Sequence, residues 1–427
     1  MRLKDVGYLY GGLTGKSGDD FHEEDPDKVK PFIPFTNVFK NFKVDVSDVR
    51  YVAMEAGEVQ NRVRQGDVLF LMSSEDYDGI GKPAVISDEV PELYLNSFCR
   101  GLRITKRNIC PEFVNYYLNG HHCREQVRLE GRGFTRVNIK VDRIAGQELK
   151  LPLFLDQRRI VDYLDSRCEA IDRKVALLER KRAAYGKLKR ALINETVSRG
   201  LDKDVELVDS GADWIAAVPK GWTLRRLQDD YLYFKGLNIT KDDLTDDGVP
   251  VVSYGQIHSK TNGGTRLKDE LLRHVPPEVA AGSSSAKLKF GDYVFADTSE
   301  DIEGLGNCVL VDRDDGVFAG YHALVARPRK VGCAKYIAYQ FQCKSWRGQL
   351  QAKAFGIKVF SVTQRMLKGV EYACPPISEQ RRIADYLDRK CAAIDAAVEN
   401  VTRQIELYRK LKRSLINEVV MGRRKVA

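Results

Sequence analysis

Residues 11–18 read GGLTGKSG, close to the Gly-rich loop that cradles nucleotide phosphates in NTP-binding proteins. That loop has the pattern Gly-x-x-x-x-Gly-Lys-Ser/Thr. Gly15 precedes Lys16 and Ser17 as required, but the position five residues before Gly15 holds Tyr10 instead of glycine. A helix should follow, but the next residues, GDDFHEEDPDKVKP, supply acids and two prolines. A polar turn is therefore the better interpretation, and we expect no nucleotide here.

Two other stretches could be taken for metal sites. HHC at 121–123 lacks a second cluster of ligands at useful spacing, so we interpret it as a polar helix end. SED occurs at 74–76 and again at 299–301, each followed by two glycines. A hairpin turn, begun by serine and closed by glycines with positive φ, explains that pattern without an ion. We expect no catalytic residues and no metal in this chain.

Basic residues give the strongest chemical signal. Residues 316–370 carry ten Lys or Arg and no Asp or Glu, which favours a polyanionic partner. Most of these cations should bind phosphates, and a few should reach base edges. The candidates in the first half of the chain are Arg100, Arg103, Lys106, Arg107, Arg124, Arg132, Arg136 and Lys140. Those in the second half are Arg327, Arg329, Lys330, Lys344, Arg347, Lys353 and Lys358.

Two polar segments, FTNVFKNFK (35–43) and YGQIHSKTN (254–262), carry side chains suited to reading bases. Their candidates are Asn37, Lys40, Lys43, Tyr254, Gln256, His258 and Lys260. The SED turns add Ser73, Ser74, Thr298 and Ser299, which could reach phosphate or base edges.

The elements that would position these residues occur twice. Residues 157–195 align with 380–418 without a gap, and 23 of the 39 positions are identical by direct comparison. The same offset continues upstream, where Cys110 matches Cys333 and Tyr116 matches Tyr339. Internal repetition on this scale sets the architecture: a variable body and a constant tail, then both again.

Each constant tail predicts a long helix with a heptad seam. The first seam comprises Val161, Leu164, Cys168, Ile171, Val175, Leu178, Tyr185 and Leu192. The second comprises Ala384, Leu387, Cys391, Ile394, Val398, Val401, Ile405, Tyr408 and Leu415. We expect the two helices to bury these seams on each other as an antiparallel coiled coil, each about 60 Å long. Basic residues on the tails could form a solvated outer face, or equally contact DNA or a partner.

The bodies read as short β-rich runs broken by Gly, Asp and Pro, each closing with a helix at 111–130 or 334–353. The predicted fold class is α+β, with two β-rich domains joined by the two helices and related by a pseudo-two-fold axis. The predicted segments are 1–150, 151–200, 201–373 (with a packed linker at 201–222) and 374–427.

Two unlike bodies on like helices would suit DNA half-sites a fixed distance apart. The chain resembles the DNA-specificity subunit of a Type I restriction–modification enzyme over essentially its whole length. The resemblance rests on Pro-x-x-x-x-Gln-x-x-Ile (Pro152 to Ile160; Pro375 to Ile383), the long helix after each, and a variable body before each. The first body lacks the Trp-Ile…Pro…Trp lead found at 214–222.

The resemblance implies two target-recognition domains that read a bipartite asymmetric site, and a scaffold for two modification subunits and the motor–nuclease subunits. S-adenosylmethionine, ATP and Mg²⁺ would then bind partner subunits and not this chain, present in one copy per complex. Nine cysteines without a C-x-x-C, and no apolar run of membrane-spanning length, predict a cytoplasmic protein with reduced thiols and no membrane partner. The alternatives are a coiled-coil adaptor without DNA contact, or a stand-alone nucleic-acid-dependent ATPase or nuclease.

Overall fold

The computed structural model describes residues 1–21, 29–55, 57–90, 92–330, 332–354 and 359–426. The chain divides into two compact units. Unit 1 comprises Met1–Glu179 and Thr402–Ala427, and unit 2 comprises Arg180–Val401. No helix among the described residues combines the length and the apolar character needed to cross a membrane.

Unit 1 is built on a four-stranded antiparallel sheet in the order β1-β8-β4-β6. A second sheet has the order β3-β2-β7, and a short pair joins β5 to β9. The strands are β1 (Gly7–Gly11), β2 (Val29–Ile33), β3 (Arg50–Ala53), β4 (Val68–Leu71), β5 (Ser73–Ser74), β6 (Pro83–Val85), β7 (Tyr94–Leu95), β8 (Cys99–Ile104) and β9 (Val137–Asn138). The helices of the body are α1 (Phe35–Lys40), α2 (Pro111–Asn119), α3 (His121–Glu130) and α4 (Val141–Ala145), with 3-10 turns at Leu3–Asp5 and Asp19–Phe21.

Unit 2 repeats this topology with sheets β13-β20-β16-β18 and β15-β14-β19 and the pair β17-β21. These strands are β13 (Tyr231–Lys235), β14 (Val249–Val252), β15 (Arg273–Val275), β16 (Tyr293–Ala296), β17 (Thr298–Ser299), β18 (Cys308–Leu310), β19 (Phe318–Ala319), β20 (Ala323–Pro328) and β21 (Phe360–Ser361). Two further pairs join β10 (Leu207–Ala212) to β11 (Ile215–Pro219) and β12 (Thr223–Arg226) to β22 (Glu371–Cys374). The helices are α6 (Leu227–Asp230), α7 (Tyr254–Ile257), α8 (Pro277–Ala280), α9 (Ala334–Gln340), α10 (Lys344–Gln351) and α11 (Gln364–Lys368), with 3-10 turns at Lys241–Asp243 and Asp269–Leu271.

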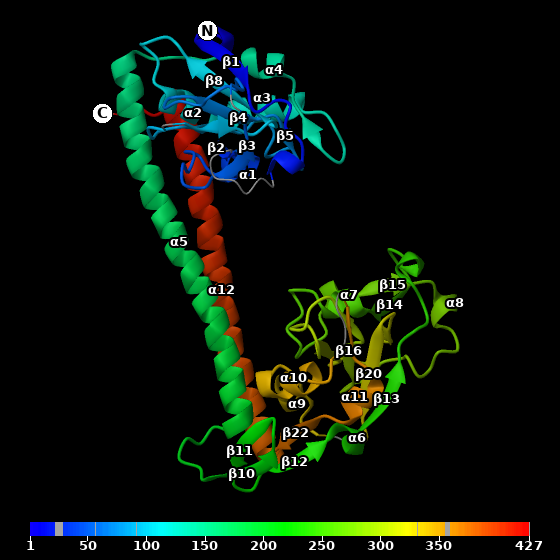
Figure 1. Cartoon of the computed structure of the whole chain (residues 1–427). Coiled ribbons are helices and arrows are strands. Elements are labelled where there is room, and N and C mark those ends of the chain that lie inside the picture. Colours follow the sequence, from blue (N-terminus) through cyan, green and yellow to red (C-terminus); the bar gives the residue numbers. More distant parts are fainter. Residues whose placement is uncertain (22–28, 56, 91, 331, 355–358, 427) are drawn as a thin grey trace. The chain divides into compact units, whose positions relative to one another are not determined.

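The constant tails form the long helices α5 (Phe154–Arg199) and α12 (Ile377–Val420), as Figure 1 shows. In unit 1, Val161, Leu164, Cys168 and Ile171 of α5 share a core with Leu415 and Val419 of α12. Lys412 pairs with Asp172 at 2.6 Å, and Arg409 pairs with Glu179 at 2.7 Å. Because the α5 number rises while the α12 number falls, the two segments run antiparallel.

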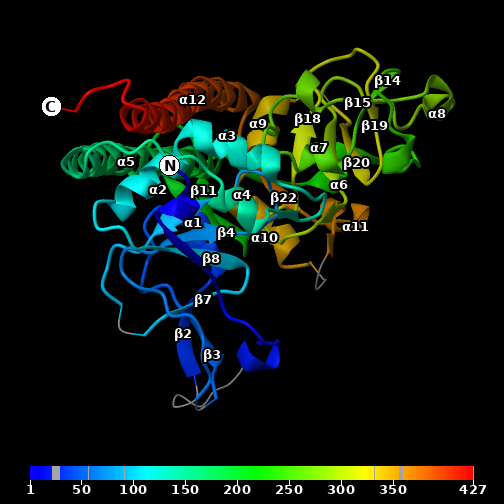
Figure 2. The ribbon, with the colours of Figure 1, turned by 90° about the horizontal axis from the view of Figure 1, so that it is seen from above.

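In unit 2, the second half of α5 packs on the first half of α12 (Figures 1 and 2). Ile193 and Val197 share a core with Ile383, Ala384, Leu387 and Cys391. Every residue of the two predicted seams is buried or half-buried in the structure. The burial follows the predicted heptad spacing, and buried apolar positions continue to Ile193 and Val197 on α5 and to Val419 on α12.

The structure differs from the sequence prediction where each body closes. We predicted single helices at 111–130 and 334–353, but each is two helices. Gly120 lies between α2 and α3 with an extended ψ of 148° and caps both helices. Residues 341–343 separate α9 from α10. The predicted linker packs down, since Ile215, Val218 and Trp222 are buried in the core of unit 2.

Candidate nucleic-acid interface

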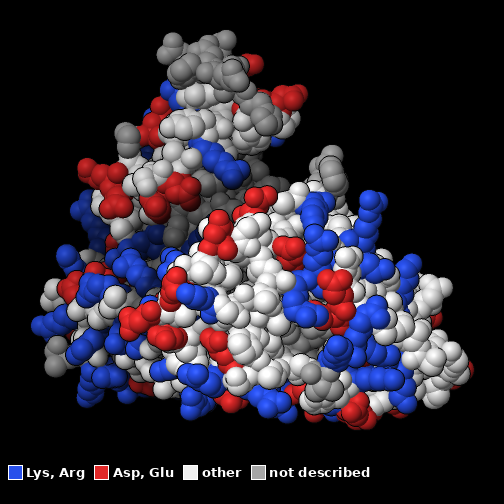
Figure 3. Space-filling model, turned by 90° about the horizontal axis from the view of Figure 1, so that it is seen from below, with Lys and Arg blue, Asp and Glu red and all other residues white. Residues whose placement is uncertain are grey.

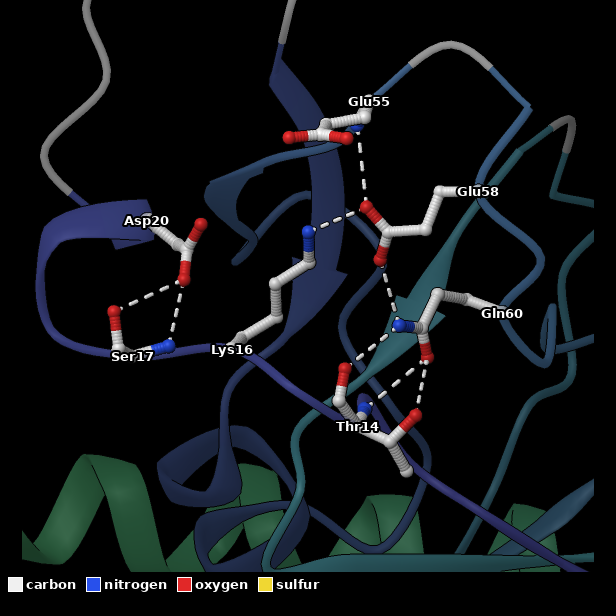
Figure 4. Close-up of polar contacts among 7 residues, drawn as sticks. All are labelled: Thr14, Lys16, Ser17, Asp20, Glu55, Glu58 and Gln60. Atoms are coloured by element: carbon white, nitrogen blue, oxygen red, sulfur yellow. Dashed lines mark hydrogen bonds and ion pairs between the residues drawn. The ribbon is translucent and has the colours of Figure 1, made fainter.

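Lys16 is the residue that a phosphate loop would need, and it is engaged within the protein (Figure 4). Its ammonium lies 2.5 Å from Glu58 Oε2, and the Lys16 side chain is only 8% exposed. Glu58 also accepts a hydrogen bond from Gln60, and Gln60 in turn binds Thr14. Hydrogen bonding by Lys16 and Gln60 holds the pKa of Glu58 below its usual value, so the carboxylate stays charged. The segment is a turn fixed by its own polar contacts.

The two SED turns have the hairpin geometry that the sequence predicts. In unit 1, Gly79 N–H donates to Asp76 Oδ1 at 2.7 Å, and Gly81 has a φ of 60°. In unit 2, Gly304 N–H donates to Asp301 Oδ1 at 2.6 Å, and Gly306 has a φ of 81°. The aspartates thus close a turn. Among the described residues, no group of three or more His, Cys, Asp or Glu could hold a metal ion.

Arg124 and Arg347 occupy equivalent positions and hold these turns in place. The Arg124 guanidinium donates to the carbonyls of Asp78 and Ile80, both at 2.8 Å. Arg347 donates to the Glu303 carbonyl at 3.2 Å and to Asn307 Oδ1 at 2.7 Å. Burial lowers the pKa of Arg124 to about 10 and also lowers the pKa of Arg347. These arginines position the loops, so their contact with DNA stays a prediction that the geometry does not favour.

Arg103 and Arg327 form a second equivalent pair, each bound to a buried aspartate. Arg103 Nη2 lies 2.7 Å from Asp67, and Arg327 Nη2 lies 2.7 Å from Asp292. Asp67 also accepts from Tyr10 Oη at 2.6 Å. The hydrogen bond to Asp67 raises the pKa of Arg103, while burial, and then Asp67, raise the pKa of Tyr10. These ion pairs link strands of the main sheets, and most of each guanidinium is unavailable to DNA.

Several polar candidates are buried or already hydrogen-bonded within the protein. The Asn37 amide donates to the carbonyls of Asp45 and Asp48, at 2.7 and 2.8 Å. Ser73, Ser74 and Ser299 are also buried, and Ser299 donates to the Asp301 carbonyl. Gln256 accepts from the Ser253 N–H as part of a helix cap. A role for these five in DNA contact stays a prediction, and the structure gives each a local partner or a buried place.

Other candidates are exposed or partly exposed cations. In unit 1 they are Lys40, Lys43, Arg100, Lys106, Arg107, Arg132, Arg136 and Lys140. In unit 2 they are Lys260, Arg329, Lys330, Lys344 and Lys353, while Lys358 lies outside the described residues. Lys43 pairs with Asp165 of α5, and Arg136 lies 4.9 Å from the centroid of the Phe98 ring. On the face shown in Figure 3, basic side chains lie interspersed with acidic ones.

Sequence reasoning missed a cluster beside the SED turn of unit 2. Tyr254 and His258 were predicted, and the structure brings Tyr321 and His322 to them, with Asp297 and Glu300. Thr298 takes part through its carbonyl, 2.8 Å from His258 Nε2. No spacing rule joins these residues, because they lie on α7, on the ends of β16 and β17, and on the segment before β20. In the sequence, these residues are indicated only by the fact that the two copies of the repeat differ at the positions they occupy.

Comparison with known proteins finds similarity to specificity subunits. No protein-family model matches it. It is 21% identical over 410 residues to the Type I restriction enzyme EcoKI specificity subunit of Escherichia coli K12, covering 93% of this chain and 82% of that protein. It is 22% identical over 406 residues, with the same coverages, to the StySPI specificity subunit of Salmonella potsdam. A putative MjaX specificity subunit of Methanocaldococcus jannaschii is 21% identical over 99% of this chain and 93% of its own.

Two solved structures share the fold. One, from work on complex assembly and conformational transition of the type I R-M system, matches with a TM-score of 0.71 and 16% identity, covering 98% of this chain and 96% of its own. The HsdS subunit from Thermoanaerobacter tengcongensis matches with a TM-score of 0.51 and 17% identity, covering 99% and 96%. The chain is therefore similar in sequence, over nearly its full length, to Type I restriction enzyme specificity subunits and has the fold of an HsdS subunit.

Proposed function

We propose that this chain is the non-catalytic DNA-specificity subunit of a Type I restriction–modification enzyme. The observation that carries the proposal is similarity to specificity subunits across 93–99% of the chain, together with a matching fold. The repeated topology supports it, because two bodies with the same strand order carry different surface residues. Each body would read one half of an asymmetric, bipartite target.

The attachment of each body to its helix supports a fixed geometry within each unit. Tyr116 Oη donates to Asp165 of α5 at 2.7 Å, and Tyr339 Oη donates to Asp388 of α12 at 2.9 Å. Lys43 and Lys335 bind the same two aspartates. The two aspartates lie 223 residues apart, and so do the two tyrosines, so the tyrosine–aspartate contact is the same in both bodies, whereas the two lysines come from different places in the repeat. We infer that α5 and α12 set the spacing between half-sites.

The helices would also serve as the assembly platform. Two modification subunits would dock on the two copies of the repeat, and motor–nuclease subunits would join them, with one copy of this chain per complex. S-adenosylmethionine, ATP and Mg²⁺ would bind those partners.

A methylation map tests the proposal. The chain is expressed with its modification subunit, and methylated bases are mapped across a host genome. We expect one bipartite asymmetric motif. Inserting one heptad into both helices, after Glu179 and after Val401, keeps the seam in register and adds about 10.5 Å, or roughly three base pairs. The half-sites should persist with a longer spacer. An unchanged spacer would refute the role of the helices in setting it.

The alternatives predict different results. A coiled-coil adaptor would show no DNA affinity that falls steeply as salt rises, whereas phosphate neutralisation requires that fall. A stand-alone ATPase or nuclease would hydrolyse ATP or cut DNA when purified without partners.

A further inference from the structure

The cluster beside the SED turn of unit 2 has the chemistry of a hydrogen-bond acceptor. Tyr254, at the start of α7, lies at its centre, and its ring centroid is 5.4 Å from that of His258 and 6.0 Å from that of His322. Tyr254 Oη donates to Glu300 Oε1 at 3.3 Å, and His322 Nδ1 lies 3.0 Å from Asp297 Oδ1. Two carboxylates therefore lie at the rim of a partly exposed aromatic surface.

His322 is held in this place at a cost in backbone energy. Among the described non-glycine residues, it alone has a positive φ, of 50°. Its carbonyl accepts from the Asp297 N–H at 3.1 Å, so backbone and side chain both bind Asp297. The imidazole nevertheless stays 57% exposed and the Asp297 side chain 31% exposed. The pair is therefore open to solvent and accessible to a ligand.

The equivalent place in unit 1 has the same backbone and different side chains. There Met72 N–H donates to the Phe98 carbonyl at 3.0 Å, just as Asp297 N–H donates to the His322 carbonyl. Gly79 faces Ser74 and the Phe39 ring, as Gly304 faces Ser299 and the His258 ring. The frame is thus common, while Asp297 and His322 replace Met72 and Phe98.

The two units also differ in the basic residue next to this place. Arg136 lies over the Phe98 ring, and the residue at its repeat position in unit 2 is Val359. The site of unit 1 therefore presents a guanidinium beside an aromatic ring. The site of unit 2 presents carboxylates and imidazole, and Arg190 and Lys260 line the pocket that Glu300 shares with Tyr254 and His258.

We infer that Asp297 and Glu300, with Tyr254 and His322, form a base-reading site that accepts hydrogen bonds from an exocyclic amine, the N4 of cytosine or the N6 of adenine. This inference rests on the proposed function. A carboxylate near DNA is repelled by phosphates, and base amines are the groups in the major groove that donate to it. Guanine O6 and N7 and thymine O4 are acceptors there, so a carboxylate disfavours them.

The test uses the full chain with its modification subunit and a randomised DNA library, with base preference read at each position. The variants are Asp297→Asn and Glu300→Gln, which keep shape but lose the charge. A third variant, Asp297→Met with His322→Phe, transplants the pair of unit 1. Glu278→Gln, an exposed carboxylate on α8 of the same unit, is the matched control.

We expect the wild-type chain to select one base pair at one position of one half-site and to need the exocyclic amine of the C or A in that pair. Asp297→Asn or Glu300→Gln should reduce that preference by roughly 5- to 150-fold, the range that one base contact commands. The other half-site and the control should keep wild-type selectivity. A thermal unfolding midpoint equal to that of the wild type checks that the Asp297 variants fold. Because Glu300 is exposed, Glu300→Gln tests the inference even if the Asp297 variants fail to fold.

Three outcomes would overturn the inference. The first is that both single variants keep every base preference while the wild type selects a bipartite sequence, which leaves the proposed function intact. The second is that the preference they alter persists in the wild type when purine replaces adenine, or 2-pyrimidinone replaces cytosine, at that position, which removes the exocyclic amine. The third is that they weaken association with the modification subunit and leave base preference alone, which makes the cluster a protein contact. Absence of any selected sequence for the wild type would instead defeat the proposed function.

Discussion

Lys189 of α5 binds both carboxylate oxygens of Asp395 of α12 at 2.7 Å. The repeat preserves this pair with the helices exchanged, because Lys412 follows Lys189 by 223 positions and Asp172 precedes Asp395 by 223 positions. There, Lys412 of α12 binds Asp172 of α5 at 2.8 and 2.6 Å. The two lysines are equally exposed, at 27% and 28%, as are the two aspartates, at 58%. The repeat therefore preserves contacts between the helices as well as residues.

The helices should depend on their apolar seam far more than on these ion pairs. A double-mutant cycle on Lys189→Ala and Asp395→Ala should give a coupling of about 0.2–1 kcal/mol, typical of exposed pairs. Leu387→Ala, at a fully buried seam position, should cost about 2–5 kcal/mol. Urea unfolding of the full chain measures both. A coupling as large as the leucine effect would contradict this ranking.

Gln157 should stabilise the junction between the body of unit 1 and α5. It is buried, accepts from the Cys110 N–H at 2.9 Å, and donates to the Pro152 carbonyl at 2.9 Å. Gln157→Leu would leave a buried N–H without its partner and should cost about 1–3 kcal/mol. Thermal unfolding measures this loss of stability, with the substitution of an exposed glutamine, Gln126→Leu, as the control. Equal effects of the two substitutions would show that the hydrogen bonds contribute little.

Arg347 should be needed for the shape of the SED turn and not for phosphate binding. Arg347→Lys loses the bond from Nε to the Phe341 carbonyl and those to Glu303 and Asn307 while keeping the charge. We expect a loss of stability of about 1.5–3 kcal/mol, from urea unfolding. The salt dependence of DNA binding should keep its wild-type slope. A slope reduced by about one unit would instead indicate a phosphate contact.

Stability should fall at alkaline pH because tyrosines are held protonated. Burial, and then the hydrogen bond to Asp165, raise the pKa of Tyr116, whereas the unfolded chain titrates near 10. The folded state therefore retains a proton that the unfolded state loses, so this stabilisation is complete below about pH 10 and declines above it, by about 1.4 kcal/mol per pH unit. Urea unfolding between pH 9 and 11 measures the decline. Tyr116→Phe should make it shallower, and exposed Tyr51→Phe should not.

The repeat makes much of the fold predictable, because an offset of 223 aligns positions that share a role. Cys168 with Cys391, and Asp165 with Asp388, can be paired in this way from the sequence alone. The helix break at Gly120 was missed because the apolar pattern continues through it. Gly120 itself is only a weak indication that a helix ends there.

The candidate site was less predictable, because a basic residue in the sequence does not reveal its partner. Arg103 and Arg327 were predicted to bind DNA, yet each meets an aspartate 36 or 35 residues earlier, across a sheet. Asp297 and His322 were overlooked because their juxtaposition depends on the pairing of β16 with β20. Such long-range contacts arise from tertiary packing and leave no local pattern.

The division of the chain has a consequence for synthesis on the ribosome. Unit 2 is one continuous stretch, so all of its residues are available once Val401 has emerged. Unit 1 needs Leu415 and Val419 to cover Val161, Leu164 and Ile171. The first body must therefore wait, with its helix uncovered, until more than two hundred later residues have been translated. The unit that is encoded first is completed last.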